Sequence, residues 1–221
     1  MKSLFLLILI IITSSCTRTG FKFIEKSNFD SGEIKTLHRK IAILPVNYAY
    51  NQASNTFWEN LVSKENTKVL SEQVKMGYEL QHAIYEEFSK KLSKLEVLSD
   101  EETNQVLAKK NIQYNDIRRF SKTELAKILD VDAVIYCDLY VGSITVQNNL
   151  PYGNVPIKTK SKIQLVEFVT EIHGNIEEEV VWKAKTTLPI SYIYIQNYNR
   201  KFRDVIALDL IPILPYNKTN K

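Results

Sequence analysis

The chain has 221 residues, of which 44% are hydrophobic and 24% are charged, and its formal net charge is +4. This apolar content is enough for one domain-sized core. The small charge, with no basic run interleaved with aromatic residues, argues against nucleic acid as a partner. The six glycines are scattered along the chain, so the sequence has no glycine-rich phosphate-binding loop.

The chain begins MKSLFLLILIIITSSC, a basic residue followed by a short apolar run and small residues. The run from Leu4 to Ile12 is far shorter than the roughly 20 residues of a spanning helix, and the layout predicts a signal peptide over residues 1–15. Cys16, placed after small residues, resembles the acylated cysteine in the lipobox of bacterial lipoproteins. The resemblance implies a covalent lipid on Cys16 and, because Thr17 replaces the Asp that tends to cause inner-membrane retention, a periplasm-facing place on the outer membrane. The alternative is an ordinary signal peptide with an unrelated cysteine.

Residues 16–38 are polar and lack a sustained period, so we expect a lipidated tether, followed by a single domain over residues 39–221. The apolar stretch RKIAILPVNY predicts a buried first strand. The polar segment 47–66 that follows is long for a loop inside a domain. It carries four aromatic residues, which we expect to form a partner-binding surface: Tyr48, Tyr50, Phe57 and Trp58.

The clearest helix follows, with apolar residues at spacings of three and four from Leu70 to Leu95. Gly77 lies within this apolar stripe and predicts a close approach between the helix and the sheet. Ser99 with Glu102, and Ser121 with Glu124, have the spacing of capping boxes that begin two further helices.

The second half of the chain reads as strands followed by a C-terminal helix. The stretch DVDAVIYCDLYVGSITVQ predicts a strand with Cys137 as a small buried hydrophobe, and the segments IKTKSKIQLVEFVTEI and EEEVVWKAKTTL predict two more. The final helix should end before Pro212. The expected order is β-α-β-α-α-β-β-β-α, an α/β sandwich whose mixed, partly antiparallel sheet is flanked by helices.

No enzyme signature is present. The sequence contains neither a G-x-S-x-G elbow nor an H-E-x-x-H pair. We expect His38, His82 and His173 to be surface residues because their spacing does not suit a metal. The hypothesis is therefore a protein without catalytic residues, metal or small-molecule substrate.

Several ordered pieces together resemble one lipoprotein superfamily. They are KIAILPV, GYELQHAIYEEFSKKL, LEVLSDEETNQVL, ELAKILDVDAVIYCDLYVGSI and IQLVEFVTEIHGNIEEEVVWKAK. The superfamily contains curli-secretion lipoproteins, lipoprotein activators of penicillin-binding proteins and related outer-membrane lipoproteins, and the resemblance covers roughly residues 39–188.

The resemblance implies a non-enzymatic module for binding or assembly in envelope biogenesis or secretion, with an envelope protein or a second copy as partner. Two alternatives remain open: a regulator of a peptidoglycan synthase and an oligomeric secretion channel. Channel-forming members cross the outer membrane with hairpins. Residues 142–162 look too short and too interrupted by proline for such a hairpin.

Overall fold

The computed structural model describes residues 22–29, 31–50, 62–152, 155–176, 180–189, 192 and 198–217. Cys16, Phe57 and Trp58 therefore lie outside the described residues, and so does the expected signal peptide. Within the described part of the chain, no helix combines the length and apolar character that crossing a membrane requires.

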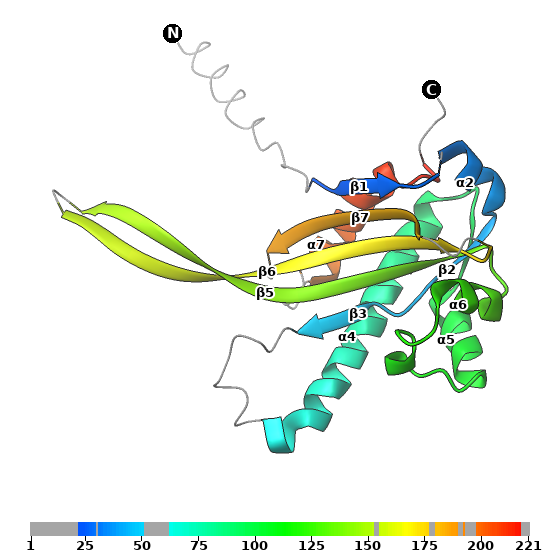
Figure 1. Ribbon diagram of the computed structural model, residues 1–221, viewed down its shortest axis with the longest axis horizontal. Coiled ribbons are helices and arrows are strands. Elements are labelled where there is room, and N and C mark those ends of the chain that lie inside the picture. The colour runs from blue at the N-terminus through cyan, green and yellow to red at the C-terminus, as the bar shows by residue number, and fades with distance from the viewer. Residues whose placement is uncertain are drawn as a thin grey trace, which may run out of the picture.

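A seven-stranded mixed sheet organises the protein, in the order β1-β7-β6-β5-β2-β4 with β3 also paired to β5 (Figure 1). Its strands are β1 (Ile24–Ser27), β2 (Lys40–Ile43), β3 (Asn47–Tyr50), β4 (Glu96–Leu98), β5 (Ala133–Tyr152), β6 (Val155–Gly174) and β7 (Val180–Pro189). β2 runs parallel to β4 and β5, whereas β6 is antiparallel to both β5 and β7. The predicted α/β sandwich with a partly antiparallel sheet is confirmed.

Helices cover both faces of this sheet (Figure 1). They are α2 (Ser31–Leu37), α4 (Val62–Lys91), α5 (Asp100–Lys109), α6 (Lys122–Leu129) and α7 (Tyr198–Val205). The core on one face joins α4 and α7 to the sheet, and a second core joins α5 and α6 to the β2–β5 part of the other face. The rest of that second face, over β6 and β7, carries exposed charged side chains.

The apolar stripe of α4 packs as its spacing predicts. Leu80, Ile84 and Phe88 are fully buried and belong to the same core as Ile135 of β5. Gly77 is buried too, and a Cβ built on it would lie 2.6 Å from the carbonyl oxygen of Val46 and 2.6 Å from the hydroxyl of Tyr114. The glycine is therefore the point where α4 approaches the turn between β2 and β3, as predicted.

Two helix starts were predicted from serine caps. At Ser99 both halves of the capping box form, since its hydroxyl accepts from the Glu102 amide and the Glu102 carboxylate accepts from the Ser99 amide. At Ser121 the hydroxyl accepts from the Glu124 amide at 3.1 Å. The C-terminal helix α7 ends at Val205, and helical turns continue to Ile213 through Pro212.

The segment expected as a tether is part of the domain from residue 22 onward. β1 pairs antiparallel with β7, α2 buries Ile34, and Phe23 reaches the same core as Phe88. The sequence conceals this because all four residues of β1 are exposed, so the strand has no apolar alternation.

The segment 47–66, expected to be a loop, is also partly regular. Residues 47–50 form β3 and pair with β5, and α4 already begins at Val62. The remaining residues, 51–61, lie outside the described part of the chain.

Candidate functional site

Of the four aromatic residues that were predicted to form a partner surface, the structure describes the side chain of Tyr48 and the backbone of Tyr50. Tyr48 is only 4% exposed and belongs to the main core, and its backbone amide donates to the Tyr114 hydroxyl at 2.9 Å. It is therefore a core residue and not a surface anchor. Tyr50 ends β3, where its backbone pairs with Val141. Phe57 and Trp58 fall outside the described residues.

The strands predicted on either side of the proline-containing segment form one long hairpin, which is longer than the sequence interpretation expected. β5 and β6 pair without interruption over twenty register positions, from Ala133 with Gly174 to Tyr152 with Val155. β3 accompanies β5 only as far as Val141, and β7 accompanies β6 only from Leu165. Residues 143–152 and 155–164 therefore form a two-stranded ribbon that no other described strand joins, and it extends away from the helices (Figure 1).

The ribbon is long enough to reach well beyond the domain. Its ten register pairs span about 30 Å at about 3.3 Å per residue. The prolines that argued against it, Pro151 and Pro156, are paired with each other next to the tip. A proline there removes an amide only at the end of the ladder, where the loss matters least. This position explains why the two prolines do not interrupt the hairpin.

The register places apolar and polar residue pairs alternately along the ribbon. One set of alternate pairs is mostly apolar: Ile144 with Ile163, Val146 with Ser161, Asn148 with Thr159, Leu150 with Ile157 and Tyr152 with Val155. The other set, apart from the proline pair, is polar: Ser143 with Gln164, Thr145 with Lys162, Gln147 with Lys160 and Asn149 with Lys158. Alternate positions of a strand belong to one face, so the register indicates one mostly apolar and one basic face. The ribbon sequence contains three lysines and no acidic residue.

A polar cluster fixes β3 to β5 close to the base of the ribbon. The Asn47 side-chain amide donates to the Asp138 carboxylate at 2.5 Å, and the Arg118 guanidinium donates to the Asn47 side-chain oxygen. Nearby, the Lys122 ammonium lies 4.3 Å from the centroid of the Tyr136 ring. Burial raises the pKa of Tyr136, and the adjacent Asp138 carboxylate raises it further. These contacts fix β3 to β5 close to the point where the ribbon begins.

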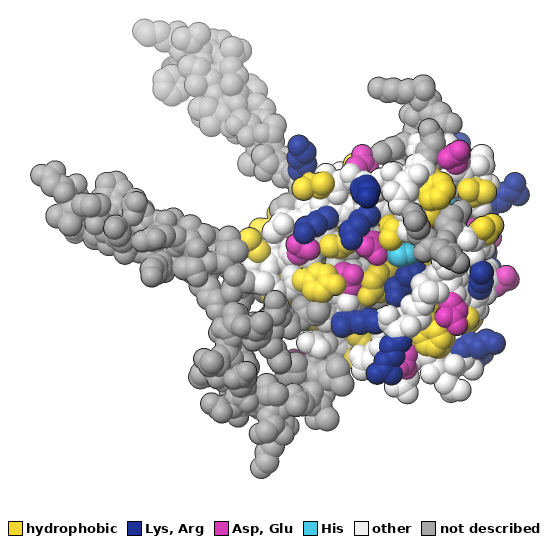
Figure 2. Space-filling model, in the orientation of Figure 1, with side chains coloured by type: hydrophobic (Ala, Val, Ile, Leu, Met, Phe, Trp, Pro, Cys, Tyr) yellow, Lys and Arg dark blue, Asp and Glu magenta, His cyan; other side chains and the backbone are white. Residues whose placement is uncertain are grey.

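On the face of the sheet that α5 and α6 leave open, acidic side chains of β6 lie beside basic side chains of β7 (Figure 2). Glu171 accepts from Lys183 at 2.7 Å and contacts His173 at 3.1 Å. The hydrogen bond from His173, helped by Lys183, lowers the pKa of Glu171 to about 2. Lys185 pairs with Glu167 at 2.6 Å. These carboxylates of β6 are therefore paired with lysines of β7.

The remaining polar candidates have structural partners. His38 was expected at the surface but is only 4% exposed, and its Nδ1 lies 2.9 Å from the Tyr216 hydroxyl. Cys137 is fully buried, and burial raises the pKa of its thiol to about 12, as suits a structural cysteine. Among the described residues, no three His, Cys, Asp or Glu side chains are grouped as metal ligands.

No family model matches the chain, and no curated protein is similar to it in sequence. Solved structures do match. Lipoprotein GNA1162 from Neisseria meningitidis is 13% identical, with a TM-score of 0.36 over 68% of this chain and 80% of that one. A PelC dodecamer from Paraburkholderia phytofirmans is 10% identical, with a TM-score of 0.41 over 90% and 99%. The LpoB C-terminal domain from Salmonella enterica is 11% identical, with a TM-score of 0.36 over 72% and 92%.

Proposed function

We propose that this chain is a non-enzymatic lipoprotein of the outer membrane that faces the periplasm and works as a binding or assembly module in envelope biogenesis or secretion. The observation that carries the proposal is the β5–β6 ribbon, whose ten register pairs have no neighbouring strand among the described residues. The lipidated Cys16 would hold the domain at the membrane.

Without a partner, the ribbon would be only marginally stable in water. An isolated two-stranded hairpin is marginally stable. No described strand pairs with either edge of the ribbon, and the amide and carbonyl groups of an open edge attract other strands. A partner that covers the mostly apolar face or pairs with an edge stabilises it. That partner is an envelope protein or a second copy of this chain, and the synthase-regulator alternative is the case in which the partner is a peptidoglycan synthase.

One specific observation favours a second candidate function, an oligomeric secretion channel. Each strand of the ribbon has ten residues, within the roughly 9–11 residues of a transmembrane strand. The mostly apolar register set is interrupted at its centre by Asn148 paired with Thr159. Lipid-facing positions of such strands are apolar, so a protein partner suits this ribbon better than lipid does.

The test is a chain without the ribbon. Because Ser143 pairs with Gln164, replacing residues 144–163 with Asn-Gly closes the hairpin with a two-residue type I′ turn. Light scattering on the detergent-extracted proteins should show a complex for the full chain and the monomer mass for the shortened one, at similar melting temperatures. An assembly of unchanged mass in the shortened chain would contradict the proposal. Ribbon-dependent conductance in planar bilayers would favour the channel.

A further inference from the structure

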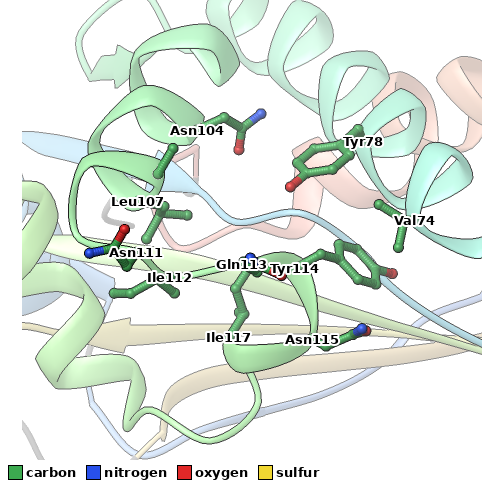
Figure 3. Close-up of a pocket in the computed structure, with 11 residues that line it drawn as sticks. Val74, Tyr78, Asn104, Leu107, Asn111, Ile112, Gln113, Tyr114, Asn115 and Ile117 are labelled. Atoms are coloured by element: carbon green, nitrogen blue, oxygen red, sulfur yellow. The ribbon is translucent and has the colours of Figure 1, made fainter. Parts of the chain in front are cut away.

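A pocket of about 400 Å³ lies between α4, α5 and the segment that follows α5 (Figure 3). Its volume falls within the ~300–1,000 Å³ of typical small-molecule sites. Apolar side chains such as Leu107, Ile112 and Ile117 form part of its lining. The polar lining consists of amides and phenols, and none of the described lining residues is charged: Tyr78, Asn104, Asn111, Gln113, Tyr114 and Asn115.

A buried core residue, Gln81, fixes the orientation of the Asn104 side-chain amide in the pocket lining. Gln81 is fully buried, and its Nε2 donates to the Ile43 carbonyl at 2.7 Å. Its Oε1 is thereby left as an acceptor, and Asn104 donates to it from Nδ2 at 2.9 Å. The Oδ1 of Asn104 must then point the other way. This oxygen is buried and has no hydrogen-bond donor among the described residues.

Such an oxygen is costly, because a buried acceptor without a partner keeps its full desolvation penalty. Across the pocket, Tyr78 projects from α4 with its hydroxyl toward the space between the helices (Figure 3). The described residues offer that hydroxyl no hydrogen bond either. Tyr114, by contrast, is fixed, since its hydroxyl donates to the Val46 carbonyl at 2.6 Å and accepts from the Tyr48 amide at 2.9 Å.

We propose that this pocket binds one unit of an uncharged sugar. Sugar hydroxyls donate and accept at closely spaced positions, which matches side-chain amides that present both functions. With a small shift of the buried Asn104 side chain toward the pocket, a hydroxyl or acetamido N–H inserted between α4 and α5 would reach its oxygen. The apolar face of the ring would pack against the tyrosine and aliphatic lining. A charged ligand would find no counter-ion among the described lining residues.

Binding is tested with the full chain in a detergent without a sugar headgroup, by saturation-transfer difference NMR. The probe is N-acetylglucosamine, which offers hydroxyls, an amide N–H and a methyl group. Glucuronate tests the neutrality of the site, and a blocked alanine tripeptide tests whether the pocket takes a peptide instead. We expect saturation of N-acetylglucosamine alone.

Two variants locate the site. Tyr78→Phe removes the free hydroxyl and should weaken binding about three- to tenfold, the effect of one neutral hydrogen bond. Tyr85→Phe, on the same helix outside the pocket lining, is the matched control and should bind as the parent does. Val74→Trp should fill the pocket and abolish binding.

The proposal is overturned if N-acetylglucosamine fails to bind at millimolar concentration or if the peptide or glucuronate binds in its place. It is equally overturned if folded Tyr78→Phe and Val74→Trp proteins bind the sugar as the parent does. Because the pocket and the ribbon share no residue, ribbon-dependent assembly is unaffected by any of these results.

Discussion

Gly77→Ala tests whether the close contact between α4 and the β2–β3 turn contributes to the free energy of unfolding. The new Cβ would lie 2.6 Å from two atoms, the Val46 carbonyl oxygen and the Tyr114 hydroxyl. Overpacking of this kind costs roughly 1–3 kcal/mol. Displacing Tyr114 also weakens its hydrogen bond to Val46, a loss of about 1 kcal/mol. Alanine recovers about 1 kcal/mol of helix propensity, so the net loss of unfolding free energy should be about 1–3 kcal/mol.

Urea denaturation followed by circular dichroism measures this loss. Gly142→Ala is the matched control, because no described atom beyond its chain neighbours lies within 4 Å of the added Cβ. Its urea midpoint should stay near that of the parent. Tyr114→Ala should make room for the new methyl group, so Gly77→Ala should cost less in that background. A Gly77→Ala protein as stable as the parent would refute the close approach.

Three other changes test the core, the open face and the anchor. Phe88→Ala should cost about 3–5 kcal/mol of unfolding free energy in chemical denaturation, because the ring is fully buried. The lowered pKa of Glu171, about 2, adds stability that is present above its unfolded value of about 4.3 and is lost as the pH falls toward 2. Glu171→Gln should therefore lose less stability between pH 5 and 2 than the parent does in acid titrations of the melting temperature. Cys16→Ser should leave the protein unlipidated and absent from the outer-membrane fraction, as mass spectrometry and fractionation would show.

The sequence predicts the parts of this fold that have strong local patterns. The stripe of α4, the close approach at Gly77 and the cap at Ser99 all follow from spacing within one segment. β1 and β3 could not be predicted in the same way, because their order comes from pairing with β7 and β5. Tyr48 illustrates the consequence, since an aromatic residue in a polar segment is buried once that segment becomes a strand.

The full length of the ribbon and the pocket escaped prediction for related reasons. The two prolines of the ribbon suggest an interruption until the register shows that they face each other at its tip. The orphaned oxygen of Asn104 depends on Gln81, which lies on a different helix. Neither arrangement has a signature within a single stretch of sequence.

Hydrogen exchange of the ribbon amides in native membranes tests the central claim most directly. Amides that another chain covers exchange slowly, whereas those of an isolated marginal hairpin exchange fast. Residues 166–172, which pair with β7, are the internal reference and should be protected in every sample. The account predicts that residues 144–163 are protected in membranes and in the extracted complex, and that they lose this protection when the complex is dissociated to the monomer. Rapid exchange of these residues in the membranes would contradict it.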